Sequence, residues 1–275
     1  MTELLRTGIY QLVEGKHGRF LANPQDLYMG RALIHYGEFS EQEWSLLDQL
    51  LRPGMVAIEA GANMGALTVP MARKIGVEGL LYAFEPQLVV FQQLCANLAL
   101  NDLVNVPAFN AGCGEVSDWM STIRPDPRTE NNFGGYSLQK LARDTPIKIR
   151  VERLDDAVDP PRLDLIKADV EGMETQVLKG AAGLIAKFRP LLYLEANKDD
   201  APGIIEHVLS LDYEAWWHLP LLFNPNNHLG VTENLFGNIT SKNILCAPVE
   251  RTLKVGDAPK VTGPEDHPAN WATRA

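Results

Sequence analysis

Short apolar runs alternate with amphipathic segments over most of the chain, and this alternation predicts the fold. Apolar runs of strand length occur at residues 55–59, 80–84, 104–109, 163–169 and 191–196. The intervening segments at 66–74, 88–100, 173–179 and 204–211 predict helices. Two late strands are predicted at 216–223 and 243–247. Strands separated by helices in this rhythm predict an α/β fold with a doubly wound, mostly parallel sheet.

The pattern divides the chain into three parts. Residues 1–39 predict a β-rich extension or lid, with short strands near 10–13 and 18–22. A central domain over 40–250 opens with a helix, for which Ser40 and Glu43 have capping-box spacing. Within this domain, residues 114–150 predict irregular structure. Residues 251–275 are polar and contain two prolines, so we expect a loosely held tail.

Composition narrows the function classes. The 275 residues are 45% hydrophobic and 22% charged, as in ordinary soluble proteins. A net charge of −10 argues against a nucleic-acid partner, whose binding usually needs a basic face. The three cysteines form no CxxC pair, and no apolar run reaches the length of a membrane span. We therefore expect a cytoplasmic protein with no membrane partner. The sequence leaves open whether the protein forms a homo-oligomer.

A glycine-containing turn follows the first strand of the alternating region. It reads Glu59-Ala60-Gly61-Ala62-Asn63-Met64-Gly65. Doubly wound folds bind nucleotides at such strand ends. The dinucleotide fingerprint G-x-G-x-x-G is absent, because Ala62 stands between glycines four residues apart. The alternative is a turn that binds no ligand.

An acidic residue, Glu85, ends the second strand in the sequence Phe84-Glu85-Pro86. An acid about 20 residues beyond a glycine turn accepts hydrogen bonds from ribose hydroxyls. Alone, Glu85 is equally consistent with a solvated loop carboxylate. Together with the glycine turn, it favours a nucleoside ligand.

Several motifs in order resemble the FkbM-type methyltransferases, which have the Rossmann-like class I S-adenosylmethionine-dependent fold. The resemblance covers about residues 36–197 and is carried by the motifs Tyr36-Gly-Glu, Glu59-Ala-Gly-Ala-Asn-Met-Gly, Ala83-Phe-Glu-Pro, Asn97-Leu-Ala-Leu-Asn, Asp164-Leu-Ile-Lys-Ala-Asp-Val-Glu-Gly-Met-Glu and Arg189-Pro-Leu-Leu-Tyr-Leu-Glu. The resemblance implies S-adenosylmethionine as cofactor and O-methylation of a hydroxyl on a sugar or small natural-product metabolite. We expect the cofactor to contact Tyr36, Glu59, Gly61, Ala62, Asn63, Gly65, Glu85, Pro86, Asn110, Ala111 and Asp169.

The acceptor side is expected after the strand at 163–169. There Asp169 could take the hydroxyl proton or orient the acceptor, and its alternative role is to cap the next helix. His218 is a second candidate for the catalytic base. Polar and aromatic residues suited to a polyol complete the predicted acceptor pocket, and they are Asn132, Tyr136, Glu171, Trp217 and His218.

The sequence leaves open whether the site binds a divalent cation. Asp169, Glu195 and Asn197 follow neighbouring predicted strands and would offer oxygen ligands of the kind that Mg²⁺ prefers. The spacing does not decide between a metal site and a metal-free site.

Three other function classes compete with this interpretation. An NAD-dependent oxidoreductase would need the missing middle glycine. A non-catalytic relative that binds adenosylmethionine would keep the glycine turn and Glu85 without a closed acceptor pocket. A small-molecule N-methyltransferase stays an alternative, although the Asp/Asn-Pro-Pro-Tyr type of motif is absent.

Overall fold

A seven-stranded sheet forms the centre of the computed structural model, which describes residues 5–122, 124–136, 138 and 147–273. Its strands are β4 (Val56–Ala60), β5 (Leu80–Phe84), β6 (Ala108–Phe109), β10 (Leu165–Ala168), β11 (Leu191–Glu195), β12 (Tyr213–His218) and β13 (Asn243–Pro248). They lie in the order β12-β13-β11-β10-β4-β5-β6. All neighbouring pairs are parallel except those of β13, which runs antiparallel to both neighbours. The predicted doubly wound, mostly parallel sheet is confirmed.

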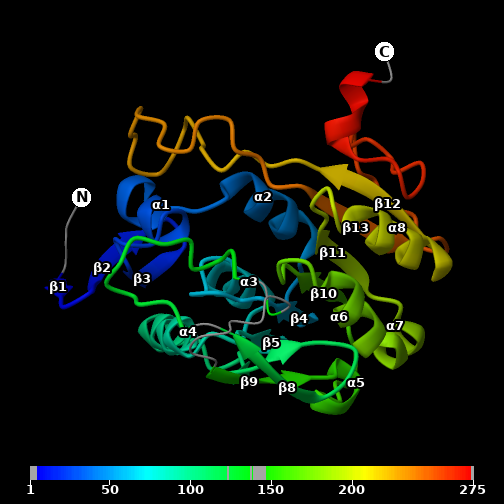
Figure 1. Cartoon of the computed structure of the whole chain (residues 1–275), viewed down its shortest axis with the longest axis horizontal. Helices are drawn as coiled ribbons and strands as arrows, with labels where there is room; N and C mark the ends of the chain where they lie inside the picture. The colour runs from blue at the N-terminus through cyan, green and yellow to red at the C-terminus, as the bar shows by residue number, and fades with distance from the viewer. Residues whose placement is uncertain (1–4, 123, 137, 139–146, 274–275) are drawn as a thin grey trace.

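Helices cover both faces of this sheet (Figure 1). One face packs against α2 (Glu41–Leu50), α3 (Thr68–Ile75) and α4 (Leu88–Leu100). The other packs against α5 (Leu154–Ala157), α6 (Glu174–Gly180), α7 (Ala182–Phe188) and α8 (Ala201–Ser210). Alternate residues of each strand enter the two cores, so Ala57 and Leu165 face α2 and α3 while Ile58 and Ile166 face α6 and α8. This two-sided burial explains the continuous apolar runs in the sequence.

The start of α2 differs in detail from the predicted cap. Ser40 has φ 47° and makes no side-chain cap hydrogen bond. Its hydroxyl donates instead to the Glu43 carboxylate, with Oγ 2.9 Å from Oε2. The helix begins where the sequence predicted, but this pair fixes the direction of Glu43 rather than capping the helix.

The N-terminal segment contains the two predicted short strands, and also a further strand and one helix that the sequence did not predict. The strands β1 (Leu5–Thr7), β2 (Tyr10–Gly15) and β3 (Gly18–Ala22) form an antiparallel sheet, and α1 (Met29–Tyr36) follows. Two side chains of the α4 region, Asn97 and Asn101, accept hydrogen bonds from the backbone of β3 at 2.7 and 3.0 Å. These bonds attach the segment to the main sheet.

Residues 112–152 contain a second small sheet, so the prediction of irregular structure over 114–150 is wrong for part of this region. The strands β7 (Gly112–Cys113), β9 (Ile147–Glu152) and β8 (Asp118–Thr122) lie in that order. In β9, buried Ile149 and Val151 alternate with Lys148 and Arg150. This period-two pattern of a half-buried strand was the available signal.

A long segment connects β12 to β13. The strand β12 ends at His218 rather than at 223, and residues 219–242 run across α1 (orange in Figure 1). The ends of this segment are pinned together by backbone hydrogen bonds, from Leu222 N to Ile239 O (3.1 Å) and from Ser241 N to Pro220 O (3.0 Å). We call residues 219–242 the cover segment.

The described part of the C-terminal segment packs on the sheet, which corrects the expectation of a loosely held tail. Val261 is 5% exposed, and its N–H donates to the Ala215 carbonyl at 2.8 Å. Asp266 accepts a hydrogen bond from the Trp271 indole at 2.9 Å, at the start of a short 3₁₀ helix, Pro268–Thr273. Among the described helices, none is long and apolar enough to span a bilayer.

Candidate active site

The topology places the candidate site between β4 and β10. From β4 the chain continues to β5 on one side, and the strand on the other side is β10, so the strand order reverses here. Open α/β sheets bind ligands at such switch points, outside the carboxyl ends of the strands. A cavity of about 320 Å³ lies there. Loops from the main sheet, the N-terminal segment and the cover segment all contribute to its wall.

Most of the predicted site residues line this cavity. They are Glu59, Gly61, Ala62, Asn63, Glu85, Pro86, Asn132, Tyr136, Asp169 and Glu171, together with the metal candidates Glu195 and Asn197. The sequence also assigns the polar loop 130–137, which contains Asn132 and Tyr136, to the acceptor pocket, and its last residue, Ser137, lies outside the described residues.

The glycine turn owes its sequence to contacts within the protein. Gly61 has φ 84°, and a Cβ atom there would lie 1.9 Å from the carbonyl oxygen of Asp169. The backbone N–H groups of Gly61 and Ala62 both donate to the Phe84 carbonyl at 2.9 Å. The turn after β4 is therefore packed directly against the loop after β10, and only glycine fits.

Glu85 is 4% exposed and organises the cavity floor. Its carboxylate accepts backbone hydrogen bonds from Asn63 N (3.0 Å) and Gln87 N (2.8 Å). Burial raises the pKa of Glu85 to about 7, although these two hydrogen bonds oppose the shift. The carboxylate thus fixes the glycine turn and the start of α4 while still lining the cavity.

Lys167 was not among the predicted site residues, although it forms an ion pair with Glu59. Its ammonium is 3% exposed and lies 3.7 Å from carboxylate oxygens of Glu59 and Asp169 and 3.9 Å from Glu43. Burial opposes the charged form, but these carboxylates outweigh it and raise the pKa of Lys167. A lysine in an otherwise apolar strand was the signal that could have identified this residue.

Glu59 itself is 1% exposed and accepts a 2.6 Å hydrogen bond from the Thr68 hydroxyl. Burial raises its pKa, and Lys167 opposes this shift. Glu59 was predicted to contact the cofactor, and part of its charge is therefore balanced inside the protein by Lys167.

Asp169 is not a helix cap. The N–H groups of Val170 and Gly172 donate to the Glu174 carboxylate at 2.8 and 3.2 Å, and α6 begins without a side-chain cap. The Asp169 side chain is 43% exposed and lines the cavity. Its carboxylate is therefore available to an acceptor.

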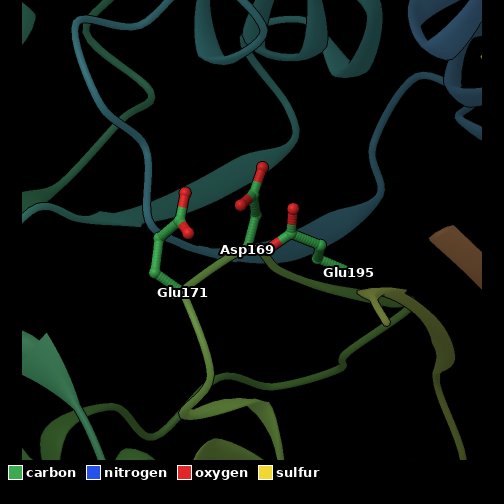
Figure 2. Close-up of side chains that lie close together, drawn as sticks. All are labelled: Asp169, Glu171 and Glu195. Carbon is green, nitrogen blue, oxygen red and sulfur yellow. The ribbon is translucent and has the colours of Figure 1, made fainter. Parts of the chain in front are cut away.

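Asp169, Glu171 and Glu195 bring their carboxyl groups together (Figure 2). One oxygen of each lies within 4.8 Å of the others. Burial, followed by the charges of Asp169 and Glu171, raises the pKa of Glu195 to about 10. Oxygen groups in this arrangement could hold a divalent cation, with Glu171 in the position that the sequence reading gave to Asn197.

Six predicted residues do not line the cavity. They are Tyr36, Gly65, Asn110, Ala111, Trp217 and His218. Gly65 faces α4, where a Cβ atom would lie 2.8 Å from Leu94. The Asn110 side-chain amide donates to the Glu85 backbone carbonyl at 2.9 Å and so stabilises the backbone of Glu85. Ala111 is buried in the core.

Trp217 and His218 depart most from their predicted roles. Trp217 is 1% exposed and packs edge-on against His267, with ring centroids 5.3 Å apart. His218 Nδ1 lies 2.8 Å from the Tyr193 hydroxyl, and burial lowers the pKa of His218 to about 4. The structure therefore gives no support to Trp217 as an acceptor contact or to His218 as the base.

Tyr36 anchors the cover segment. Its hydroxyl donates to the Glu233 carbonyl at 3.0 Å and accepts from Leu235 N at 2.8 Å. Phe223 and Phe236 pack against its ring, with centroids 5.4 and 5.8 Å away. Tyr36 thus acts at a distance from the cavity by holding part of its wall.

Comparisons with known proteins agree with this geometry. The family model described as the methyltransferase FkbM domain matches residues 59–215, more than half of the chain. The curated "Methyltransferase sdnD" of Sordaria araneosa is 33% identical over 45% of this chain, and "Methyltransferase 1" of Beauveria bassiana is 29% identical over 45%. The chain spans only 59% and 57% of the lengths of these relatives.

Solved structures with a similar arrangement include the methyltransferase FkbM of Methylobacillus flagellatus. It is 18% identical, with a TM-score of 0.48 over 74% of this chain and 50% of that one. The SAM-dependent O-methyltransferase of Thermotoga maritima is 17% identical, with a TM-score of 0.46 over 78% and 66%.

Proposed function

Because the chain belongs to the FkbM methyltransferase family, we propose that it transfers the methyl group of S-adenosylmethionine to a hydroxyl of a sugar or small natural-product metabolite. The observation that carries this proposal is the contact between the glycine turn and the Asp169 loop. This contact brings the donor-binding side and an exposed carboxylate to one cavity.

The cavity residues fit the donor. Glu85 and Gln87 are buried acceptors that suit the hydroxyl and amino groups of an adenosyl moiety. The Gln87 amide nitrogen donates to the Phe133 carbonyl at 2.6 Å, so the other amide atom is the oxygen. That oxygen is buried and has no hydrogen-bond partner among the residues that the structure describes. A buried acceptor without a partner is what a ligand donor would satisfy.

The acceptor residues would carry out a direct displacement. Bound S-adenosylmethionine supplies an electrophilic methyl group on a sulfonium. The glycine turn, Glu85 and Gln87 would hold this donor. An acceptor oxygen beside Asp169 would bond to the methyl carbon as the carbon–sulfur bond breaks and its electron pair stays on sulfur. Asp169 takes the hydroxyl proton or orients the hydroxyl, and positioning supplies much of the rate. The products are a methyl ether and S-adenosylhomocysteine.

The remaining wall suits an acceptor with polar and apolar parts. Asn132, Tyr136 and Thr240 offer amide and hydroxyl groups, and Leu222 and Ile239 of the cover segment offer apolar surface. These groups support a polyol attached to an apolar scaffold.

Mass spectrometry of acceptor mixtures tests the proposal. The protein is incubated with S-adenosylmethionine and a set of sugars, glycosides and amines, and products are examined for the gain of one CH₂. Methylated hydroxyl compounds support the proposal. Products methylated only on nitrogen would replace it with the N-methyltransferase alternative, and donor binding without any product would favour a non-catalytic adenosylmethionine-binding protein.

A further inference from the structure

The cavity wall is strongly acidic. Seven of its described side chains are carboxylic acids, two are lysines, and none is arginine or histidine. Asp169, Glu171 and Glu195 stand together at the strand ends, and Glu43 approaches from α2. An acceptor bound beside the methyl donor would lie among these groups.

The lysines do little to offset this charge. Lys167 is 3% exposed and forms ion pairs with Glu43, Glu59 and Asp169, so its charge is already shared among three carboxylates. Lys242, at the end of the cover segment, is the one other cationic side chain among the described wall residues. The described wall therefore has one partly exposed lysine against three clustered carboxyl groups.

This lining opposes the entry of another anion, because like charges would be brought together in a partly enclosed space.

We propose that the acceptor enters this cavity without a phosphate or carboxylate group, as an uncharged glycoside or polyol. This inference rests on the proposed function and narrows its substrate class. Activated sugars carry a nucleoside diphosphate, and metabolic sugars often carry a phosphate ester. The acceptor hydroxyl is therefore presented after a glycosyl transfer or a phosphate hydrolysis has removed that anion.

A bound divalent cation gives the opposite expectation. Mg²⁺ at the three carboxyl groups would invert the local charge and attract a phosphate. Experiments with Mg²⁺ and with EDTA therefore separate the two charge states of the cavity.

Paired acceptors test the proposal by turnover. Each sugar is supplied as a methyl glycoside, as its phosphate ester and as its nucleoside diphosphate, with Mg²⁺ and with EDTA. We expect kcat/KM for the glycoside to exceed that for either phosphorylated form by about 100-fold or more, because like charges would be brought together. Comparable turnover of a phosphorylated form, in either condition, would overturn the proposal.

Binding measurements decide the same question without turnover. The S-adenosylhomocysteine complex is titrated with glucose 6-phosphate and with inorganic pyrophosphate. We expect no saturable binding to the wild type and binding at least about tenfold tighter in Glu171→Lys, because one repulsive charge becomes attractive. Asp199→Lys changes the net charge equally on an exposed residue that is not among the described cavity residues, and it should not gain binding.

The outcomes are distinguishable. Saturable phosphate binding by the wild type contradicts the inference, as does a Glu171→Lys variant that gains no affinity, since shape and not charge would then exclude the anion. If no sugar in any form is methylated, the proposed function fails, and the binding titrations still decide whether the cavity rejects anions.

Discussion

Single residues connect the loops that line the cavity, and Gly61 connects the turn after β4 to the Asp169 loop through close backbone contact. Gly61→Ala would place a Cβ atom against the Asp169 carbonyl, so we expect lost stability and lost S-adenosylhomocysteine binding together. This differs from blocking the ligand alone, which would leave the fold intact. Thermal unfolding and ligand titration measure both effects.

Gly54→Ala is the matched control for Gly61→Ala. Gly54 has φ 79°, and nothing lies within 4 Å of a Cβ atom there, so it reports the backbone strain without a collision. Equal destabilisation in the two variants would show that the packed contact is unimportant.

The buried oxygen of Gln87 predicts a specific effect on donor affinity. Gln87→Met keeps the size of the side chain and removes the acceptor, so S-adenosylhomocysteine should bind about 1–3 kcal/mol more weakly. If the oxygen meets the adenine amino group, the variant should also lose the wild type's preference for S-adenosylhomocysteine over S-inosylhomocysteine. An unchanged affinity for both compounds would remove Gln87 from the donor site.

Asp169 carries the prediction about chemistry. Asp169→Asn should reduce kcat by about 10²–10⁴-fold if the carboxylate takes or directs the proton. The affinity for S-adenosylhomocysteine should change much less. Asp199→Asn, on an exposed residue that is not among the described cavity residues, is the control.

Chelation separates a base from a metal ligand at Asp169. If the three carboxyl groups hold a divalent cation, EDTA should inactivate the wild type and Mg²⁺ should restore it. Full activity in EDTA, together with a slow Asp169→Asn variant, supports the base. Normal turnover of the variant in EDTA would exclude both roles.

At the scale of elements, α1 and the cover segment form one unit through Tyr36. Tyr36→Phe removes both hydrogen bonds of the hydroxyl to residues 233–235. We expect about 1–3 kcal/mol lower stability, since buried groups lose their partners. The KM of the acceptor should rise while the dissociation constant of S-adenosylhomocysteine stays near that of the wild type. Tyr82→Phe, on β5, is the control.

The sequence predicted best the helices and strands that consist of one continuous or periodic apolar run. The strands β4, β5 and β11 and the helix α4 were predicted at or near their observed bounds, because each forms a continuous or periodic apolar run. The glycine turn and Glu85 were predicted to share a site because each directly follows one of these strands, and both line the cavity. Their partners lie just beyond a strand end, where the topology brings them together.

Residues positioned by distant segments were not predictable. Glu43 and Lys242 reach one cavity from opposite parts of the chain, and only the tertiary fold brings them there. Trp217 was assigned to the acceptor because it is aromatic, but the alternation of β12 turns it into the core with Tyr213 and Ala215. No local pattern in the sequence indicates where these three side chains lie in the fold.

At the scale of the whole molecule, several buried acids should make stability depend on pH. Burial is the largest cause of a pKa of about 7 at Glu43, Glu85 and Glu174. The folded protein then binds more protons than the unfolded chain between the ordinary carboxyl pKa and about 7, so stability falls as pH rises through this range. Burial lowers the pKa values of His207, His218 and His267, so these groups oppose the trend only at lower pH, below about 6.5.

Thermal unfolding at several pH values checks this sign. We expect the Tm to fall between about pH 6.5 and 8, and the fall to be smaller in Glu43→Gln, which lacks one of the titrating groups. A Tm that rises over the same interval would contradict the assignment of these acids.

The pinned ends of the cover segment make it a transferable module. Residues 220–222 and 239–241, near its two ends, are joined by a short backbone ladder, so a loop of different length or sequence could be grafted between them without moving β12 or β13. Its residues lie beyond the region matched by the family model. Chimaeras that exchange residues 219–242 between homologues should therefore change which acceptors are methylated, while the affinity for S-adenosylhomocysteine stays near that of the wild type.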